Sequence, residues 1–480
     1  MLSGKYKSFH SLCEQVDKNI SVGDVNVSLL LISDFVELIV TDPLCTSRIF
    51  GSKVLDYFCS KIGAVNLSKI KNDKLIDLSD KSAFVYIVTK LQNSGGHTKV
   101  IKDFIKSQTD GVHYILSTGI SGPSDLSFLS EFTSQDVFFE QAPKGSYQDR
   151  LSWLQSRLLS LAPEKTYLFN HHHDSIAVAA IQPDMGLNAF FCHHGDHHLC
   201  LGVYCSHLKH IDLHPMGYWC CRNELEIENI YVPLTTIDFG GREERAFISN
   251  GTLVTCTAAR SNKIEIPYFV SYLDVVPEIL RATGGKHVHI GKLTPWALFK
   301  IRRRLRGFNI DLSRFIYIPW VSSVWKTLHE YNVDLYIASF PYGGGLTLIE
   351  AMGAGIPVAL HRHIFSRVLS GVDLAYPGAF CWRYPEELLK YCSSVTPDEL
   401  QHASSIGRAQ FKKYHTRENI LNFTKDVGGY SVTPNAFSEK YYPDEGEMAL
   451  WLTQQVALSR LISRAIYRLY RKFKKLSAIL

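Results

Sequence analysis

The sequence lacks an apolar run long enough to cross a membrane. Its stretch SLLLISDFVELIV falls short of the roughly 18 to 20 residues that a spanning helix needs, and it carries Asp34 and Glu37. No basic, apolar leader opens the chain, and the eleven cysteines stand at irregular spacing. We therefore expect neither secretion nor a disulfide framework, and we expect a cytoplasmic protein.

Neither sign of charge is in large excess. The 480 residues carry 51 Lys and Arg against 46 Asp and Glu, a net charge of +5. This mild excess does not indicate a nucleic-acid partner. Hydrophobic residues make up 46% of the chain and charged residues 20%, which is typical of a folded soluble protein. The length predicts two or three domains.

Apolar, β-branched runs alternate with amphipathic stretches. SAFVYIVTKL, VHYILST, KTYLFN and NAFFCHH are typical of buried strands, and after the turn-rich DFGGREER a second series begins with GTLVTCTAA. This alternation predicts an α/β protein with two tandem Rossmann-like domains. We expect a mostly helical N-terminal appendage over residues 1–80, one domain over 81–245, a second over 246–430 and a helical C-terminal tail over 431–480.

Three consecutive glycines stand within SFPYGGGLTLIEAMGAGIPVAL, residues 339–360. The apolar VDLYIA precedes them, and Leu346, Ile349 and Met352 follow at helical spacing. Glycine lets backbone approach a ligand closely, and the first turn of a helix offers free N–H groups and partial positive charge. The segment therefore predicts a binding site for phosphate.

This segment resembles the donor-binding segment of GT-B fold glycosyltransferases. The matching positions are Pro341, Gly343, Glu350, Ala351, Gly355, Pro357 and Val358. The likeness is specific there, fair over about residues 250–365, and only topological in the N-terminal half. It implies an enzyme that moves a sugar from a nucleotide diphosphate sugar to an acceptor hydroxyl.

The resemblance also implies which residues bind the donor. The amides of Gly344 to Thr347 and the Thr347 hydroxyl would hold the diphosphate, and Glu350 would accept hydrogen bonds from the ribose. Other positions would neutralise the leaving group, lie near the base or face the transferred sugar. These donor-binding candidates are Arg260 and Lys263 after GTLVTCTAA, Pro319 and Trp320 after RFIYI, Gly95 and Gly96, and Tyr342, Gly343, Gly345 and Leu346 in the turn.

The segment departs from the family at Tyr342. Retaining members usually carry a second glutamate eight positions before the Glu350 equivalent, and tyrosine stands there in this sequence. The glycine-rich turn followed by threonine is similar to the O-GlcNAc transferase type, which inverts. The stereochemical outcome therefore stays open. So do two other functions: a nucleotide-sugar-binding scaffold without turnover, and a nucleotide-sugar epimerase of the same fold.

Ten of the twenty histidines lie between residues 171 and 214, in two clusters after predicted strands and in the stretch that follows them. Neither paired C-x-x-C nor H-E-x-x-H occurs, so we expect no metal site. A histidine general base, oriented by Asp174 or Asp196, is a second interpretation. A similar histidine–aspartate–histidine loop in some sugar transferases of this fold favours His194, Asp196 and His197. A third interpretation is that these histidines bond to loop backbone. No essential cofactor is expected, because the protein itself supplies cations for the diphosphate.

The segment ALSRLISRAIYRLYRKFKKLSAIL, residues 457–480, is basic and amphipathic. Arg460, Arg464, Arg468 and Lys472 stand four apart, and apolar residues gather toward another face. Such a helix suits an anionic membrane surface, and packing on the N-terminal domain is the alternative. The tail alone suggests an acceptor that is a lipid-linked or surface glycan.

Overall fold

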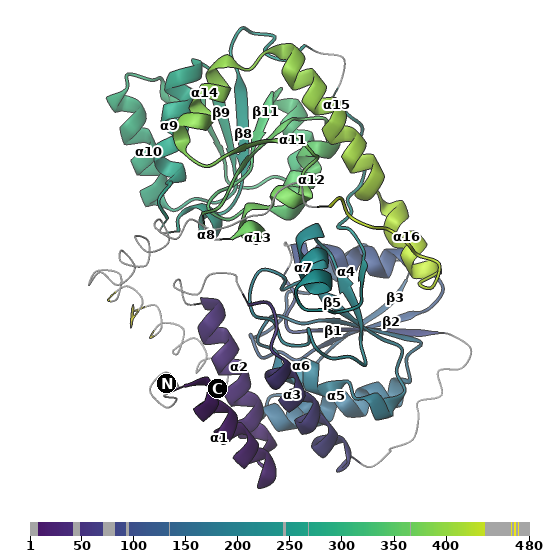
Figure 1. Cartoon of the computed structure of the whole chain (residues 1–480). Coiled ribbons are helices and arrows are strands. Elements are labelled where there is room, and N and C mark those ends of the chain that lie inside the picture. Colours follow the sequence, from purple (N-terminus) through teal and green to yellow (C-terminus); the bar gives the residue numbers. More distant parts are fainter. Residues whose placement is uncertain are drawn as a thin grey trace.

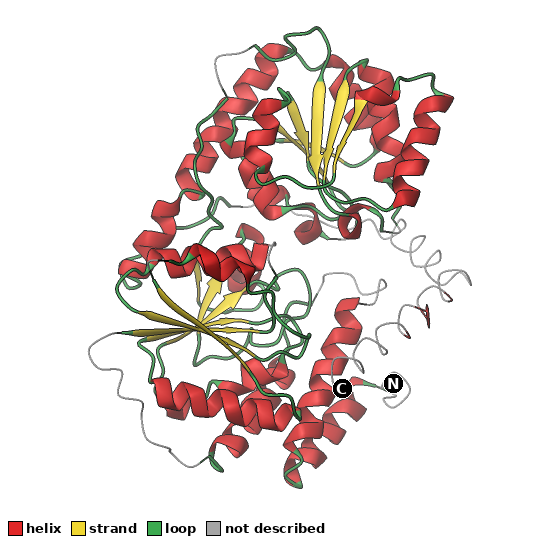
Figure 2. Cartoon of the chain, turned by 180° about the vertical axis from the view of Figure 1, so that it is seen from behind, coloured by secondary structure: helices red, strands yellow, loops and turns green. Residues whose placement is uncertain are grey.

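The computed structural model describes residues 8–41, 49–70, 82–92, 96–133, 135–242, 246–266, 268–364 and 366–436, together with Ile462, Ala465, Ile466 and Leu469. The chain forms two bodies, each built on one twisted sheet with helices on both faces (Figure 1). Figure 2 shows the two sheets from behind. The two-sheet α/β architecture is therefore confirmed.

The first sheet has seven strands in the order β3-β2-β1-β4-β5-β6-β7, and all its pairings are parallel. Its strands are β1 (Ala83–Val88), β2 (Val112–Ser117), β3 (Asp136–Gln141), β4 (Lys165–Phe169), β5 (Ala189–His193), β6 (Lys209–Asp212) and β7 (Asn229–Tyr231). The order reverses beside β1, as in a doubly wound sheet, so ligands are expected outside the carboxyl ends of these strands.

Seven α-helices belong to the first body as it is described. They are α1 (Phe9–Ser21), α2 (Val25–Thr41), α3 (Lys53–Leu67), α4 (Gly96–Ser107), α5 (Tyr147–Leu161), α6 (Ser175–Ala180) and α7 (Pro215–Asn223), with short 3-10 turns at Ser127–Glu131 and Pro183–Met185. The segment expected to be an N-terminal appendage supplies α1 to α3. Leu12, Leu29 and Ile62 share one core with Val85 and Ile87 of β1, so these helices cover a face of the sheet.

The second sheet repeats the topology with six parallel strands in the order β10-β9-β8-β11-β12-β13. Its strands are β8 (Val254–Ala258), β9 (Lys286–Ile290), β10 (Phe315–Ile318), β11 (Leu335–Ile337), β12 (Val358–His361) and β13 (Phe380–Trp382). The helices are α8 (Ser261–Ile264), α9 (Tyr272–Thr283), α10 (Pro295–Gly307), α11 (Val324–Glu330), α12 (Gly345–Gly353), α13 (Arg367–Ser370), α14 (Pro385–Ser394), α15 (Pro397–Tyr414) and α16 (Arg417–Lys425), with 3-10 turns at Leu312–Arg314 and Val372–Leu374.

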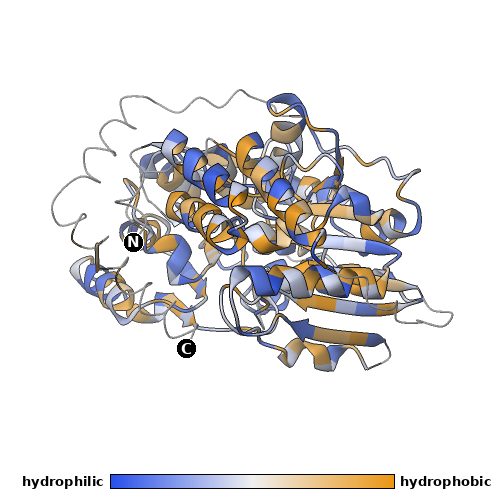
Figure 3. Ribbon diagram, turned by 90° about the horizontal axis from the view of Figure 1, so that it is seen from below, coloured by the Kyte–Doolittle hydropathy of each residue, from blue (hydrophilic) through white to orange (hydrophobic). Residues whose placement is uncertain are grey.

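Amphipathic helices flank both sheets. Figure 3 shows both hydrophilic and hydrophobic colours along them. In α4, for example, Val100, Ile101 and Phe104 are buried, while Lys102 and Lys106 reach Glu131 at the surface. Burial of one apolar face is what stabilises such helices in a folded chain.

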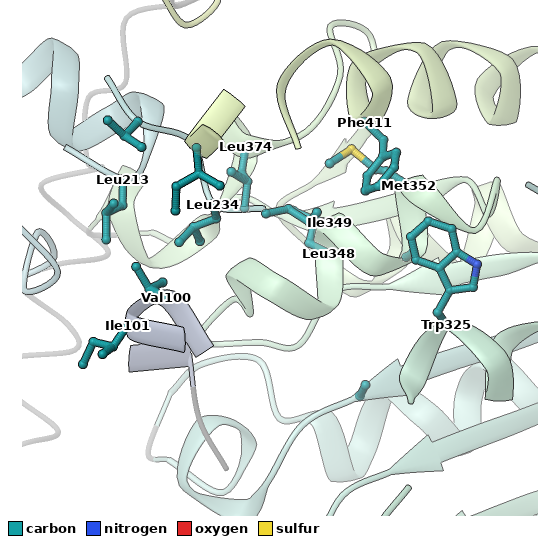
Figure 4. Packing of buried hydrophobic residues seen from close by; sticks show 14 of the residues in the cluster. Val100, Ile101, Leu213, Leu234, Trp325, Leu348, Ile349, Met352, Leu374 and Phe411 are labelled. Atoms are coloured by element: carbon teal, nitrogen blue, oxygen red, sulfur yellow. The ribbon is translucent and has the colours of Figure 1, made fainter. Parts of the chain in front are cut away.

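The two bodies are joined by packing as well as by the chain. Leu234 and Leu374 lie between Val100 of α4 and Ile349 of α12 in one continuous cluster (Figure 4). The chain also returns to the first body at α16, where the Lys165 ammonium donates to the Thr424 carbonyl at 2.9 Å. The α4 and α12 helices of different domains are thereby held close together.

The predicted tail lies mostly outside the described residues. Ile462, Ile466 and Leu469 are helical, and each is about half exposed. In the described parts of the chain, no helix has both the length and the apolar character required to span a membrane.

Candidate functional site

The glycine turn joins β11 to α12, as predicted. The Tyr342 amide donates to the Lys263 carbonyl at 3.3 Å, and the Gly343 amide donates to the Leu369 carbonyl at 2.8 Å. Gly344 is the N-cap of α12 and has extended backbone, with φ −109°. The amides that follow begin a helix, where the first N–H groups have no intrahelical acceptor. Backbone hydrogen bonds thus hold Tyr342 and Gly343 in place, and the amides at the start of α12 are left to bind a ligand.

The glycines provide space, and a left-handed backbone is not the reason for them. The glycines with positive φ in the described chain do not include Gly343, Gly344 or Gly345. A Cβ atom on Gly344 would lie 2.5 Å from Thr347 Oγ1 and 3.6 Å from Lys263 Nζ. Hydroxyl and ammonium therefore converge on the open side of Gly344.

Lys263 and Thr347 retain the capacity to bind an anion. The Lys263 ammonium donates to the Gly343 carbonyl at 3.0 Å, and burial lowers the pKa of this lysine. The Thr347 hydroxyl is buried beside the Tyr336 phenol and makes no hydrogen bond of ordinary geometry to another described residue. A phosphate at the start of α12 would be a charged acceptor for this hydroxyl.

Across the domain boundary, the turn faces His214, which the sequence analysis did not single out. His214 follows β6 as the N-cap of α7. Its Nδ1 lies 2.6 Å from Asp196 Oδ2, and its Nε2 would lie 3.2 Å from a Cβ on Gly345. Burial lowers the pKa of His214, but the Asp196 carboxylate raises it more, so the pKa stands above its usual value. The N-terminal domain thus directs one imidazole nitrogen toward the glycine turn.

The three predicted catalytic residues lie near one another, but Asp196 has a closer partner than either histidine. Asp196 is buried; burial raises its pKa, but His214 lowers it to well below its usual value. His197 Nδ1 is 3.8 Å from Asp196 Oδ1, and its ring packs edge-on against His172. The His194 ring stacks on His97 at 4.7 Å, and burial lowers its pKa to about 3. The geometry therefore pairs Asp196 with His214 more closely than with His197.

Asp174, the other carboxylate considered as an orienting group, is committed to structure. It caps α6 by accepting from the Ala177 amide, and its Oδ2 accepts from the hydroxyls of Thr89 and Thr118 at 2.6 Å each. These bonds join β1, β2 and α6. Hydroxyl and backbone amide donors therefore occupy the Asp174 carboxylate, whereas Asp196 pairs with an imidazole.

Glu350 lies one turn after Thr347 on α12, and its carboxyl is largely buried. Burial raises the pKa of Glu350 to about 7, and the charge of Lys99 on α4 lowers it by a smaller amount. Lys99 itself binds Asp103 at 2.5 Å and the Thr235 carbonyl at 3.2 Å. Glu350 is therefore a carboxyl group with a pKa of about 7 at the boundary of the two domains.

The remaining predicted positions occupy the strand ends. Arg260 is the exposed N-cap of α8, directly after β8. Pro319 and Trp320 follow β10 and are exposed. The Tyr342 ring lies 6.3 Å from that of His363, and burial raises the tyrosine pKa.

The shorter glycine turn is described only in part. Gly95 lies outside the described residues. Gly96 begins α4, and a Cβ there would lie 3.7 Å from Leu346 Cδ1 on α12. The start of α4 is thus next to the start of α12.

Four buried side chains behind His214 have the donor atoms for a metal ion. They are His193, His210, Asp212 and Cys221. A Cβ on Gly217 would lie 2.9 Å from Asp212 Oδ1 and 3.0 Å from Asp196 Oδ2, so this group and the His214–Asp196 pair are neighbours. Both depend on β6, a strand of sequence KHID that has no long apolar run.

Comparisons with known proteins bear on the fold. No protein-family model matches the chain, and no curated protein sequence matches it. Anabaena HepE in complex with UDP is 11% identical over 72% of this chain and 99% of its own, with a TM-score of 0.54. HepE in complex with UDP and glucose is 11% identical over 72% of this chain and 98% of its own, with a TM-score of 0.52. The lipopolysaccharide outer core galactosyltransferase WaaB, in its apo form, is 15% identical over 72% of this chain and 98% of its own, with a TM-score of 0.49. The GT-B fold that the sequence predicted is confirmed.

Proposed function

With the GT-B fold as the premise, we propose that this chain is a glycosyltransferase that moves a sugar from a nucleotide diphosphate sugar to an acceptor hydroxyl. The observation that carries the proposal is the convergence of the start of α12, Thr347 Oγ1, Lys263 Nζ and His214 Nε2 on the open side of the glycine turn. All of these can donate hydrogen bonds to a diphosphate. The UDP and glucose bound by HepE support the same ligand class.

Catalysis would depend on the charge that the leaving group acquires. When the bond between the sugar and the diphosphate breaks, negative charge develops on the phosphate oxygens, and fixed donors stabilise it without reorganising. The amides of Gly344 to Thr347 and the Lys263 ammonium would bind those oxygens, and Arg260 would add a second positive charge. Because the protein provides these donors, the proposed reaction needs no essential metal or cofactor at the diphosphate.

His214 would act on the same group from the N-terminal domain. Asp196 holds Nδ1, which fixes the ring and leaves Nε2 directed at the turn. We assign to His214 a hydrogen bond to the distal phosphate or the transferred sugar. In this proposal Asp196 keeps the orienting role expected from the sequence, His214 is its partner, and His194 and His197 lie beside the site.

Recognition of the nucleoside and sugar would use the flanking positions. Glu350 would accept hydrogen bonds from the ribose, Pro319 and Trp320 would contact the base, and Gly95, Gly96 and Leu346 would border the transferred sugar, with Tyr342 and Gly343 shaping the turn. These roles follow from the resemblance and from the positions of the residues at strand and helix ends.

The acceptor proposal depends on the tail sequence. The basic, amphipathic residues from about 455 onward favour a glycan or glycolipid acceptor at an anionic membrane surface, with the protein in the cytoplasm. Removal of these residues should abolish binding to anionic vesicles and leave activity on a soluble acceptor. A truncated chain that unfolds would instead assign the tail to packing.

The proposal is tested with a panel of nucleotide sugars and their nucleoside diphosphates. A ligand present at 100 times its dissociation constant should raise the free energy of unfolding by about 2.7 kcal/mol, measured as a thermal shift. Release of nucleoside diphosphate in the presence of an acceptor would then establish turnover. Binding without release would favour the scaffold, a nucleotide sugar converted into its epimer would favour the epimerase, and binding of no panel member would contradict the proposal.

A further inference from the structure

The first domain contains a second group of chemically active side chains, entirely beneath its surface. His193 ends β5, His210 and Asp212 lie on β6, and Cys221 lies on α7. All four residues are buried. Together they offer two imidazole nitrogens, one carboxylate and one thiol, which is the ligand chemistry of zinc.

The four donor atoms lie within 4.8 Å of one another, so they are close enough to share one ion. His193 Nδ1 and Asp212 Oδ1 are 3.0 Å apart, and His210 Nε2 and Asp212 Oδ2 are 3.3 Å apart. Cys221 Sγ is 3.5 Å from His193 Nδ1 and 3.6 Å from Asp212 Oδ1. With zinc–ligand bonds of about 2.0 to 2.3 Å, the ligand atoms of a tetrahedral site are separated by about 3.3 to 3.7 Å, so His193 Nδ1 and Asp212 Oδ1 would move apart by about 0.3 Å on binding.

Two further observations favour a ligand over a simple hydrogen-bonded network. His210 Nε2 is fully buried and points at Asp212, yet it makes no hydrogen bond of ordinary geometry to a described residue. Asp212 is in turn held from outside, because the Asn229 side-chain amide donates to its Oδ2 at 2.6 Å and to the Tyr218 carbonyl at 2.8 Å. Carboxylates that ligate metals are typically fixed in this way.

We propose that His193, His210, Asp212 and Cys221 bind one structural Zn²⁺ ion. Four protein ligands leave no open position for water or substrate, which is typical of structural sites. On binding, the Cys221 thiol loses its proton to solvent, and His193 and His210 bind as neutral imidazoles, each with its proton on the ring nitrogen that does not bond to the metal.

The ion would fix α7 against β5 and β6. His214 is the N-cap of this helix, and Gly217 in its first turn packs against both Asp212 and Asp196. The site therefore supports the element that carries His214. The proposed site is distinct from the diphosphate site, and it differs from the expectation of no metal site, which was based on short motifs. These ligands are spread over 29 residues, from 193 to 221, without any such motif.

The decisive experiment measures the metal content of the full chain. Chain purified without chelator should contain about one zinc per molecule. Cys221→Ser removes a ligand and should lower zinc affinity by more than about 100-fold, since loss of an outer partner of a ligand alone costs about 10- to 100-fold. The matched control is Cys220→Ser, because Cys220 is the adjacent buried cysteine on α7, and its Sγ faces Glu224 at 3.5 Å. The control should retain the zinc.

Cobalt replacement identifies the ligands. Co²⁺-loaded wild type and Cys220→Ser should show the thiolate-to-cobalt charge-transfer band and tetrahedral d–d bands, and Cys221→Ser should lack the former. Should Cys221→Ser fail to fold, wild type stripped by chelator and titrated with Zn²⁺ still decides, since one equivalent should raise its melting temperature. Wild type that binds no zinc in this titration, or a charge-transfer band that survives Cys221→Ser, would overturn the proposal. Nucleoside diphosphate binding is not part of this readout.

Discussion

The two domains contribute to the candidate site in different ways. The C-terminal domain presents backbone, since Gly344 to Thr347 are consecutive residues that form the N-cap and first turn of α12. The N-terminal domain presents side chains, since Asp196 and His214 follow different strands and meet only in the folded sheet. A site made of backbone depends on local geometry and on room for the ligand. A site made of imidazole and carboxylate depends on long-range packing and on buried charge.

The largest expected effect comes from closing the backbone half. Gly344→Val places a branched side chain against Thr347 Oγ1 and Lys263 Nζ, where a phosphate oxygen should lie. Loss of two or more charge-assisted hydrogen bonds should weaken nucleoside diphosphate binding by about 1000-fold or more, measured by calorimetry.

Gly307→Val is the matched control for this loss, because a Cβ on Gly307 meets nothing within 4 Å. Thermal melts of both variants accompany the titrations, so that unfolding is separated from loss of the site. A folded Gly344→Val protein with unaltered affinity for the bare nucleoside diphosphate would contradict the phosphate site and most of the case for a transferase.

The sequence predicted the backbone half better than the side-chain half for a physical reason. Glycines, a helix start and Glu350 fall within one short segment, so local propensity and a resemblance were sufficient. The strand β6 has the sequence KHID. Because three of its four residues are polar, it has no apolar run that would predict a strand, although His210 and Asp212 are buried. Without β6, neither His214 nor the buried group of His193, His210, Asp212 and Cys221 could be placed.

Other differences have the same origin. The edge strand β3 was not predicted, because half-exposed strands lack a continuous apolar run, and it alternates between exposed and partly buried positions. The rings of His97, His171 and His194 pack together across 5.2 Å and 4.7 Å, which no spacing along the sequence indicates. Pairing of side chains from separate strands is a property of the sheet order.

The second prediction tests the side-chain half. His214→Gln removes the imidazole that faces Gly345 while keeping a polar side chain, and loss of one preorganised donor should lower kcat by about 100-fold. His197→Gln and His194→Gln are the matched comparisons from the predicted loop. Steady-state kinetics on all three should give the largest loss for His214→Gln, whereas equal or larger losses in either other variant would return the role to that residue.

The third prediction separates binding from stability at Glu350. Glu350→Gln replaces a charged acceptor for the ribose with a neutral one, so donor affinity above pH 7 should fall by about 1 to 3 kcal/mol. The wild-type carboxyl has its pKa raised from 4.5 to about 7, so the folded state binds more protons than the unfolded state between these values. Its contribution to stability is therefore present below pH 4.5 and is lost as the pH rises through about 7.

The same substitution should consequently stabilise the fold at high pH. At pH 8 the glutamine variant should unfold with a free energy about 1 to 3 kcal/mol higher than wild type, and at pH 4 the two should be similar. Denaturant titrations at both pH values give the measurement, with the exposed Glu330→Gln as the control for loss of a carboxylate. If Glu350→Gln is less stable than wild type at pH 8 and binds the donor with unchanged affinity, Glu350 does not bind the ribose.

The smallest expected effect concerns Trp320, at the end of the edge strand β10. Its side chain is 70% exposed, so Trp320→Ala should leave the melting temperature unchanged. Stacking on a nucleobase contributes about 1 to 3 kcal/mol where the base is well covered. Since this indole is open to water and β9 and β8 separate its strand from the glycine turn, the loss of nucleoside diphosphate affinity should be about two- to fivefold, below 1 kcal/mol.

Trp296→Ala is the control, because Trp296 on α10 is 65% exposed in the same domain. The nucleoside diphosphate should lose affinity in Trp320→Ala and not in Trp296→Ala, while inorganic diphosphate should bind equally to both. Equal nucleoside diphosphate affinities in the two variants would place the base elsewhere, and a loss shared with inorganic diphosphate would mean that Trp320 acts on the turn and not on the base.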